Sequence, residues 1–314
     1  MRPHPAITIV TPCLNRVETV AAAIESVRDQ DFDAEVDHII IDGGSTDGTL
    51  EVLARYPHLT VISERDKNLY DAINKGIGRA RASIVGLLNT DDVYTPGALR
   101  KAAETLRTMP STSMACGGAE VVDRNGKLLL RYDRQSNRSL DPSDILLRVP
   151  IVNARFFRKE IFDRVGLFDT RYRIVADREF LFRAALAGER TTPIPGIVYR
   201  YGWHKESITV GGKGGRKRIS EETMLMVEEW LSKGAALPRN ATVSLKRLHA
   251  QCVLTNLAQD IALGKIVSTA ATLRHAQRVN PSWMLAACAA LVSWAGRWPT
   301  YLAYRVRVAN CVKE

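Results

Sequence analysis

Four apolar segments alternate with helical patterns over the first 110 residues, and no other feature of the sequence constrains the fold as strongly. The apolar segments cover residues 7–10, 36–41, 59–62 and 84–88. Their length and their β-branched residues are typical of strands, and apolar residues recur at helical spacing between them. Consecutive strand–helix units build parallel sheets with helices on both faces. The sequence therefore predicts an α/β fold with a Rossmann-like, mostly parallel sheet flanked by helices.

Polar residues ahead of the helical patterns predict where the helices begin. Asn15 stands at the first position of a capping box, and either Thr46 or Asp47 can cap the following helix. Thr95 and Pro96 form a good N-cap and first-turn pair for a further helix.

The pattern changes after residue 110. Two apolar segments, 114–122 and 127–132, flank an Asn-Gly pair and predict an antiparallel hairpin that joins the sheet. Residues 211–218 are rich in glycine and basic side chains, which indicates a mobile loop or a linker. From residue 219 to 314 the pattern is helical. We therefore expect a sheet domain over residues 1–210, the loop or linker, and a C-terminal helical extension.

Charge and cysteine content narrow the setting. The 44 Lys and Arg residues outnumber the 34 Asp and Glu residues, so the formal charge of +10 favours nucleic acid, phosphorylated ligands or an anionic membrane as partners. The five cysteines are scattered without metal-ligand spacing, which fits a reduced compartment. The first residues lack the apolar core of a signal peptide. These features together predict a cytoplasmic protein.

Polar clusters follow three of the predicted strands. They cover residues 11–15, 42–47 and 89–92. Ligands of open parallel sheets bind outside the carboxyl ends of the strands, so the three clusters would converge on one crevice. The sequence contains neither the P-loop pattern nor the GxGxxG pattern at these positions, so nucleoside triphosphatase and dinucleotide-binding signatures are missing.

The residue types in the clusters suggest a phosphate-bearing ligand and a cation. Asp42 can accept hydrogen bonds from a nucleobase or a ribose, although Asp42 and Asp47 can equally serve as turn formers and helix caps. Asp91 and Asp92 are adjacent and repel each other unless a divalent cation such as Mg2+ or Mn2+ lies between them and a phosphate. The alternative for this pair is an exposed turn ahead of a helix.

Four segments together resemble the family 2 glycosyltransferases of the GT-A fold, in particular the bacterial branch that builds exopolysaccharide and lipopolysaccharide and includes colanic-acid-type enzymes. The segments read ITIVTPCLN, DGGSTDGT, SERDKNLYDAINKGIGRARASIVGLLNTDD and VGLFDTRYRIVADREFLFRAALAG. The resemblance covers residues 7–209 and implies a nucleotide-sugar half over residues 1–110 and an acceptor half over residues 111–210.

The resemblance also implies a donor site for a nucleotide-diphosphate sugar, with a UDP-sugar favoured. Asp42 would contact the base, and Asp91 would face the ribose. The residues expected to line or border the same donor site are Thr11, Asn15, Asp66, Lys67 and Asn74. Many relatives carry an acid where this chain has Gly43, so the base contact is thinner here. Asp71, in the same stretch, can instead be an acid favoured by the helix dipole.

Catalytic roles follow from the same resemblance. Asp92 would coordinate the cofactor, Mn2+ or Mg2+, and His204 would lie near that metal or be merely structural. Asp177 would be the general base that deprotonates the acceptor hydroxyl, with Glu179 as a rival, and either residue can instead be an acid at a helix start. Direct attack by the acceptor would invert the anomeric centre.

The acceptor is expected near Asn153 and Arg155, where relatives often read His-Gln before an aromatic residue, and Glu179 would contribute to this acceptor region. The loop with Lys213, Arg216, Lys217 and Arg218 can close over the diphosphate or remain solvated. We expect no nucleic-acid partner, because the basic residues lack interleaved aromatics. A catalytically silent protein that binds sugar nucleotides is the alternative to the transferase.

Residues 283–294 form an apolar run that is too short to span a bilayer. Aromatic residues and arginines follow it, which suits a helix at a membrane surface and a lipid-linked saccharide acceptor. Packing against the rest of the protein is the alternative. The predicted location is therefore the cytoplasm, with a possible peripheral contact on the inner face of the cytoplasmic membrane.

Overall fold

The computed structural model describes residues 6–132, 140–149, 151–204, 215–234, 237–262, 264 and 266–288. The chain divides into two compact units. The sheet unit comprises Met1–Leu140 and Pro150–Trp203, and the helical unit comprises Asp141–Val149 and His204–Glu314. The short segment Asp141–Val149 thus leaves the sheet unit although the sequence on both of its sides belongs there.

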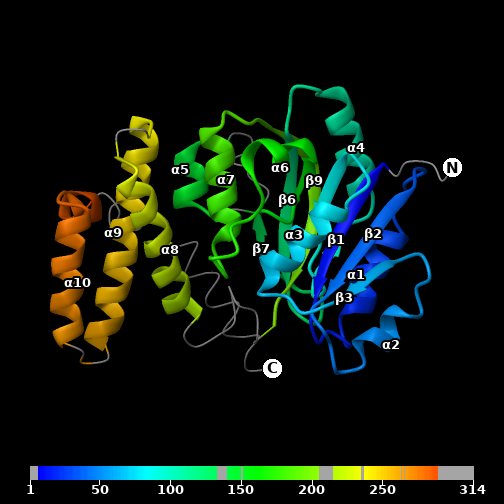
Figure 1. Cartoon of the computed structure of the whole chain (residues 1–314), viewed down its shortest axis with the longest axis horizontal. Helices are drawn as coiled ribbons and strands as arrows, with labels where there is room; N and C mark the ends of the chain where they lie inside the picture. The colour runs from blue at the N-terminus through cyan, green and yellow to red at the C-terminus, as the bar shows by residue number, and fades with distance from the viewer. Residues whose placement is uncertain are drawn as a thin grey trace. The chain divides into compact units, whose positions relative to one another are not determined.

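The N-terminal half of the sheet is parallel, as predicted. Its strands lie in the order β3-β2-β1-β4, and all three of these pairings are parallel. The strands are β1 (Ile7–Cys13), β2 (Val36–Asp42), β3 (Thr60–Ser63) and β4 (Ile84–Leu87). The helices that follow them are α1 (Val20–Arg28), α2 (Thr49–Leu53), α3 (Leu69–Arg79) and α4 (Ala98–Thr108), as Figure 1 shows. The four predicted strand–helix units are therefore confirmed.

Helices cover both faces of this half because successive strand residues point to opposite sides. On one face, Ile9 of β1 packs in an apolar cluster with residues of α1 and α4. Ile40 of β2 packs in a second cluster, with residues of α1 and α2. Ile39 and Ile41 pack on the other face against Ala72 of α3. The sheet is thus doubly wound, as expected for an α/β fold.

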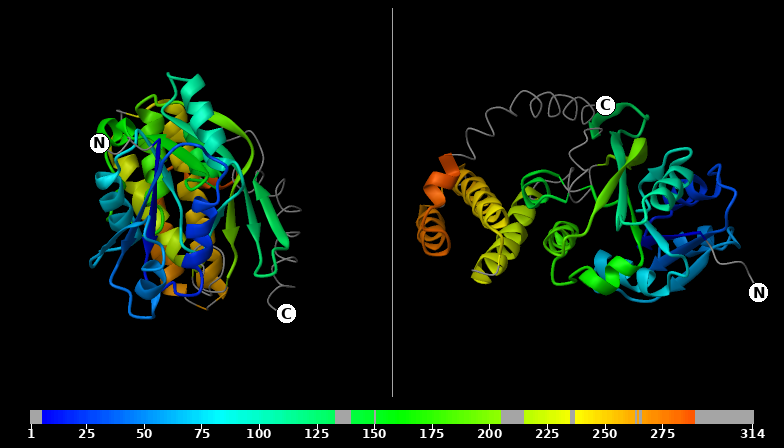
Figure 2. Two further views of the ribbon diagram at one scale, coloured as in Figure 1. Left: turned by 90° about the vertical axis from the view of Figure 1, so that its right-hand side faces the viewer. Right: turned by 90° about the horizontal axis from the view of Figure 1, so that it is seen from above.

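The C-terminal half of the sheet is mixed rather than parallel. Strand β8 (Arg155–Arg158) pairs antiparallel with β4 and with β6 (Met114–Val122). Strand β9 (Thr191–Gly202) then runs parallel to β6 and pairs antiparallel with the short β5 (Val93–Tyr94). Figure 2 shows the curled sheet from two further sides. The prediction of a mostly parallel sheet therefore applies to the first half only.

The predicted hairpin is present. Strand β7 (Leu128–Tyr132) pairs antiparallel with β6. Asp123 closes the turn, because its Oδ1 accepts hydrogen bonds from the amides of Asn125 and Lys127 at 3.0 and 2.9 Å. Gly126 adopts the left-handed φ of 77° that such a turn requires.

Two of the predicted helix starts are wrong. Asn15 has a φ of 52° and turns its side chain to Thr46, so it caps no helix, and α1 begins later, at Val20. Thr95 donates its hydroxyl to the carbonyl oxygen of Ile197 on β9, and α4 therefore begins only at Ala98. In both cases a tertiary hydrogen bond takes the side chain that a local cap would need.

Two helices lie between β8 and β9 and cover one face of the C-terminal half. Helix α6 (Glu160–Val165) and helix α7 (Ala176–Leu186) frame a loop that contains Phe168. The rings of Phe168 and Phe180 lie 4.7 Å apart, and Phe157 of β8 contacts Phe180 edge to face. This aromatic cluster fixes α7 on the sheet.

The helical unit contains α5 (Pro142–Leu147), α8 (Gly215–Ser232), α9 (Arg239–Ala262) and α10 (Ile266–Val279), and α9 packs against the other three (Figures 1 and 2). The predicted helical extension is confirmed. Residues 215–218 were expected in a loop but form the first turn of α8, where Lys217 pairs with Glu221 one turn later. Residues 211–214 of that loop lie outside the described part of the chain.

The described part of the apolar run 283–294 ends at residue 288. Trp283 and Ala287 are buried against Val253 and Ala276 of the helical unit, whereas Met284 and Leu285 are 60% and 76% exposed. Among the described residues, none of the helices combines the length and the apolarity needed to cross a membrane.

Two glycines of α3 provide a matched test of the packing between α3 and β1. A Cβ atom at Gly76 would overlap Cγ1 of Val10, whereas a Cβ atom at Gly78 would meet nothing within 4 Å. We expect Gly76→Ala to lower the free energy of unfolding by about 1–3 kcal/mol through overpacking. Gly78→Ala should raise it by up to about 1 kcal/mol, because alanine favours the helix. Chemical denaturation of both variants checks this, and equal effects would contradict the packing.

Candidate functional site

The carboxyl ends of β1, β2 and β4 are neighbours at one edge of the sheet. Cys13 pairs with Asp42 in the parallel register, and the amide of Leu88 donates to the carbonyl oxygen of Val10 at 3.0 Å. Asn15 joins the first two polar clusters directly, because its amide donates to Ser45 Oγ at 2.8 Å and its Oδ1 accepts from the amide of Thr46 at 2.9 Å. Asn15 therefore shapes the loop of residues 42–47.

Asp42 closes that loop from inside. Its carboxylate is fully buried, accepts from the amides of Gly44 and Ser45 at 3.1 Å each, and accepts from the hydroxyl of Ser63 at 2.6 Å. The hydroxyl of Ser45 donates to it as well. These donors occupy the lone pairs of the carboxylate, so Asp42 orders its own turn, and its contact with a base stays a prediction. The amides at the end of the strand need an acceptor, and the carboxylate of Asp42 supplies it.

Thr11 is also turned inward. It is fully buried, and its hydroxyl lies 3.0 Å from Nε2 of His38 on the neighbouring strand. Its hydroxyl thus faces the neighbouring strand, and its place in the donor site stays a prediction. Burial, together with the charge of His58, lowers the pKa of His38 to about 3, so this imidazole is neutral.

Asp66 lies at the edge where the donor was expected. One of its oxygens accepts from Lys75 Nζ at 2.7 Å, and the other lies 3.2 Å from the position that a Cβ atom on Gly43 would take. A carboxylate thus occupies the space beside Gly43. Asp71 Oδ2 accepts from the amide of Lys67 at 3.0 Å, so Asp71 caps this turn at the start of α3.

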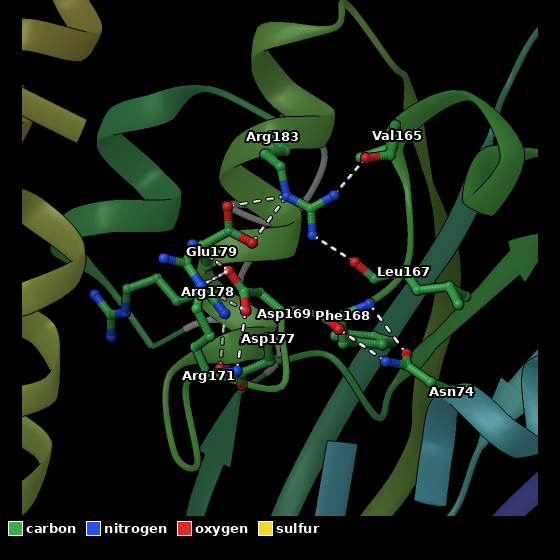
Figure 3. Close-up of polar contacts among 10 residues, drawn as sticks. All are labelled: Asn74, Val165, Leu167, Phe168, Asp169, Arg171, Asp177, Arg178, Glu179 and Arg183. Atoms are coloured by element: carbon green, nitrogen blue, oxygen red, sulfur yellow. Dashed lines mark hydrogen bonds and ion pairs between the residues drawn. The ribbon is translucent and has the colours of Figure 1, made fainter. Parts of the chain in front are cut away.

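Asn74 binds the backbone of a distant loop, and its predicted donor contact stays a prediction. Its Nδ2 donates to the carbonyl oxygen of Phe168 at 2.8 Å, and its Oδ1 accepts from the amide of the same residue at 3.1 Å (Figure 3). Asn68 and Tyr70, also near the start of α3, donate to the carbonyl oxygens of Thr170 and Ile174 at 2.8 and 3.0 Å. Helix α3 thus holds the loop that leads into α7.

Asp91 and Asp92 form the turn after β4. Asp92 is buried and accepts three hydrogen bonds, from Asn89 Nδ2 at 3.1 Å, from the hydroxyl of Tyr199 at 2.7 Å and from the amide of Gly202 at 3.0 Å. Burial, followed by the charge of Asp91, raises the pKa of Asp92 to about 8, although these three donors oppose the shift. Asp91 is half-buried and is the more accessible member of the pair.

Sequence reasoning missed the residues of β9 that hold this turn. Tyr199 lies 107 positions after Asp92, and no local pattern links the two residues. A Cβ atom on Gly202 would overlap the carbonyl oxygen of Asp91, so only glycine fits beside the turn. The one available signal was the glycine that ends a long strand-like segment.

Asn153 and Arg155, the predicted acceptor residues, are both buried. Asn153 Nδ2 donates to the hydroxyl of Tyr199 at 3.1 Å, so it supports the residue that holds Asp92. Arg155 is 2% exposed, and its Nη1 donates to Thr191 Oγ1 at 3.1 Å. Both side chains thus have partners inside the sheet unit, and their role toward an acceptor stays a prediction.

Helix α7 begins with the two carboxylates that were considered as bases (Figure 3). Glu179 is buried, and both of its oxygens accept from Nε of Arg183, at 2.9 and 2.8 Å. Arg183 in turn donates to the carbonyl oxygens of Val165 and of Leu167, the latter at 2.7 Å. Glu179 is therefore committed to the arginine that pins the loop, whereas Asp177 is half-buried in the first turn of the helix.

Tyr201 relates Asp177 to Asp92. Burial, and then the negative charges of Asp92 and Asp177, raise the pKa of Tyr201 well above its ordinary value. Both carboxylates therefore act on the same phenol at the end of β9. His204 is the first residue of the helical unit, and its place near the metal stays a prediction. Lys213 lies outside the described residues.

The donor set at residues 91–92 fits a divalent cation of the Mg2+ or Mn2+ type. Two adjacent carboxylates repel each other, and Asp92 Oδ1 accepts a single hydrogen bond, which leaves a lone pair on that oxygen. Within the described part of the chain, no group of three or more histidine, cysteine, aspartate or glutamate residues is arranged to hold a metal. The pair therefore suits a cation that takes its remaining ligands from phosphate and water.

The chain belongs to glycosyl transferase family 2, whose sequence pattern matches residues 8–166, more than half of its length. It is therefore a glycosyltransferase. The resemblance inferred from the motifs is confirmed.

Three relatives show the range of the family. An uncharacterised glycosyltransferase of Mycobacterium tuberculosis is 30% identical over 202 residues, which cover 61% of this chain and 73% of that protein. A PGL/p-HBAD biosynthesis glycosyltransferase of Mycobacterium bovis is 26% identical, with 57% and 69% covered. The succinoglycan biosynthesis protein ExoO of Rhizobium meliloti is 28% identical, with 65% and 63% covered.

Solved structures agree on the fold. The structure of S. aureus TarS 1-349 in complex with UDP-GlcNAc has a TM-score of 0.62 at 16% identity and covers 90% of this chain and 81% of that one. The mannosyltransferase PcManGT of Pyrobaculum calidifontis, in complex with GDP-Man and Mn2+, has a TM-score of 0.59 at 19% identity, with 99% and 87% covered. These likenesses confirm the predicted GT-A fold.

The buried His38 makes the stability of the protein depend on pH. Its pKa is about 3 in the folded protein and near 6.5 when unfolded, so its stabilising contribution is complete above pH 6.5 and is lost as the pH falls toward 3. We expect the free energy of unfolding to fall by up to about 1.4 kcal/mol per pH unit in this window through His38. In the double variant Thr11→Val/His38→Leu, the free energy of unfolding should no longer fall in this way between pH 6.5 and pH 5.

Denaturant unfolding at several pH values measures the effect. The control is His58→Gln, which removes an exposed histidine of the same unit. Its free energy of unfolding should keep most of the wild-type dependence on pH. An unchanged pH dependence in the double variant would show that His38 does not carry it.

Proposed function

We propose that this glycosyltransferase moves a sugar from a nucleotide-diphosphate sugar, preferably a UDP-sugar, to a hydroxyl of a saccharide acceptor with inversion of the anomeric centre. The observation that supports the proposal is that two separate acidic positions approach the end of β9. Asp92 is held by Tyr199 and Gly202 of that strand, and the charges of Asp92 and of Asp177, at the start of α7, both contribute to the raised pKa of Tyr201.

This arrangement suits a direct displacement. The diphosphate leaves from one side of the anomeric carbon, and the acceptor hydroxyl attacks from the opposite side, where a base must take its proton. A carboxylate pair suited to a cation and a separate carboxylate at the start of α7 supply these two functions. The products are the inverted glycoside and the nucleotide diphosphate.

Asp177 is the better candidate for the base. Glu179 is buried and paired with Arg183, and a base must be within reach of the substrate. Asp177 is half-buried at the first turn of α7, where its Oδ1 accepts from the amide of Arg178 at 2.7 Å. Glu179 would then support the acceptor region only by holding the loop of residues 165–168.

The pair at residues 91–92 would hold Mn2+ or Mg2+, with Asp91 as the more accessible ligand. The cation would supply charge stabilisation for the departing diphosphate when it is bound. Asp66, beside Gly43, is the candidate for recognition of the nucleoside, since the carboxylate of Asp42 is committed to its own turn.

The acceptor and the cellular setting are inferred from relatives and charge. The name of ExoO refers to succinoglycan biosynthesis, and the M. bovis relative is named for PGL/p-HBAD biosynthesis, which favours surface polysaccharide or glycolipid synthesis here. A lipid-linked saccharide acceptor fits both names. The formal charge of +10 supports a peripheral contact with the anionic cytoplasmic face of a membrane.

Replacement of the two acids of α7 tests the assignment of the base. We expect Asp177→Asn to lower the rate of nucleotide diphosphate release by about 10²- to 10⁴-fold, because general base catalysis contributes that much. Its affinity for UDP should remain unchanged. The matched variant Glu179→Gln keeps an acceptor for Arg183, so its rate should fall less than about tenfold, although its stability falls.

The assay offers UDP-glucose, UDP-galactose, UDP-N-acetylglucosamine and GDP-mannose with Mn2+ and measures release of UDP or GDP. Full activity of Asp177→Asn would show that the base is another residue. Binding of a nucleotide sugar without any turnover by the wild-type protein would favour the silent sugar-nucleotide-binding protein. Failure to bind any of the four would contradict the proposed function altogether.

A further inference from the structure

We propose that Lys75 is a positioning residue of the donor site: its ammonium holds one oxygen of Asp66, so that the other oxygen accepts the single N–H of a uracil ring. This inference rests on the proposed function, which assigns Asp66 to the nucleoside. It adds the residue that orients this carboxylate and the base that the carboxylate selects. Sequence reasoning had given Lys75 no role.

The ammonium of Lys75 gathers the chain between β3 and α3. Its Nζ lies 2.7 Å from Oδ1 of Asp66, 2.9 Å from the carbonyl oxygen of Arg65 and 3.1 Å from Oε1 of Glu64. An ammonium has three N–H donors, so these three acceptors match its full capacity. Lys75 therefore fixes this short segment of the loop, and it holds Asp66 through Oδ1.

The same segment is also tied to the end of β2. The amide of Glu64 donates to the carbonyl oxygen of Asp42 at 2.9 Å, and the hydroxyl of Ser63 donates to the carboxylate of Asp42 at 2.6 Å. The chain that leads to Asp66 is thus anchored on β2 and on α3. A carboxylate held in this way is preorganised, so little conformational freedom is lost when it binds a ligand.

The second oxygen of Asp66 faces the space that the missing side chain of Gly43 leaves. Oδ2 lies 3.2 Å from the position that a Cβ atom on Gly43 would take, and Cδ1 of Leu14 lies 3.5 Å from that position. The side chain of Asp66 is 9% exposed, and within the described residues its Oδ2 accepts no hydrogen bond. Leu14 is 53% exposed. An acceptor beside an exposed apolar side chain suits a flat ring with an N–H at its edge.

The place of Gly43 in the sheet suits the base of a nucleotide. Gly43 directly follows β2, and β1 separates β2 from β4, which leads into the turn of residues 91–92. Adjacent strands lie about 4.8 Å apart, so the ends of β2 and β4 are about 10 Å apart. A nucleoside and its first phosphate bridge such a span. A base at Gly43 therefore leaves the diphosphate near the carboxylate pair.

The orientation of Asp66 favours uracil over guanine. Uracil has one ring N–H, which lies between two carbonyl groups, whereas guanine presents two neighbouring N–H groups at one edge. A carboxylate with both oxygens directed at the ligand can accept both. Here Oδ1 is turned to Lys75 and only Oδ2 is directed at the space beside Gly43. Guanine would leave one donor unpaired, which weakens its binding.

The test compares ligands with and without the N–H. Calorimetry with Mg2+ measures the affinity for UDP, for N3-methyl-UDP, for GDP and for pyrophosphate. We expect the wild type to bind UDP at least about 10-fold more tightly than N3-methyl-UDP or GDP, because the lost hydrogen bond involves a charged group.

Lys75→Met releases the carboxylate of Asp66. It should lower the affinity for UDP roughly 3- to 10-fold, reduce the preference for UDP over N3-methyl-UDP to less than about threefold, and leave pyrophosphate binding within about twofold. Lys75→Arg keeps the cation and should retain most of the preference. A merely structural role of Lys75 would weaken UDP and N3-methyl-UDP alike and leave the preference unchanged. The matched control Arg79→Met removes an exposed cation of the same helix and should change none of these affinities.

Gly43→Ala tests the space itself. Gly43 is not among the glycines with a left-handed backbone, so alanine is compatible with its conformation. The added Cβ atom would occupy the position 3.2 Å from Oδ2 of Asp66. We expect this variant to lose at least as much affinity for UDP as Lys75→Met and to bind pyrophosphate as the wild type does.

Four results would overturn the proposal. They are an unchanged preference for UDP over N3-methyl-UDP in Lys75→Met, an equal loss of pyrophosphate and UDP binding in that variant, wild-type affinity of Gly43→Ala for UDP, and a wild type that binds N3-methyl-UDP or GDP as tightly as UDP. If Lys75→Met does not fold, the wild-type comparison and Gly43→Ala decide. Failure of the wild-type protein to bind any nucleotide sugar would instead refute the proposed function.

Discussion

The candidate site depends on the buried carboxylate of Asp92. An acid next to another acid is costly to bury, and the structure offsets that cost with donors from Asn89, Tyr199 and Gly202. Two of these donors belong to β9, which follows the turn by more than 100 residues. The carboxylate pair therefore acquires its position only when the C-terminal half of the sheet has joined the N-terminal half.

The same dependence on distant segments applies to the acids of α7. Asn74 clamps the backbone of Phe168, and Arg183 connects Glu179 to the carbonyl oxygens of Val165 and Leu167. The loop that leads to Asp177 is thus fixed by α3 from the nucleotide half and by α7 itself. Family membership makes the chain a glycosyltransferase, and these contacts fix the start of α7 within the sheet unit.

Sequence reasoning identified the elements more reliably than the partners of individual side chains. The strands β1 to β4 and the β6–β7 hairpin were predictable, because apolar runs and the Asn-Gly pair are local signals. The convergence of the strand ends followed from sheet geometry. The hydrogen bonds of Thr11, Asp42 and Asn74 were not predictable, because their partners are distant in the sequence. Thr11 contacts His38, 27 positions away, and Asp42 contacts Ser63, 21 positions away. Asn74 contacts Phe168, 94 positions away. Register and packing decide these contacts, and neither is written in a local pattern.

The central claim is that the pair at residues 91–92 receives a nucleotide diphosphate through a divalent cation. Calorimetric titration of UDP into the protein with and without Mn2+, for the wild type and for Asp91→Asn, tests it most directly. The account predicts that Mn2+ tightens UDP binding at least about tenfold, equivalent to 1.4 kcal/mol, and that Asp91→Asn abolishes the gain. Equal affinity for UDP with and without Mn2+ in the wild type would contradict the account.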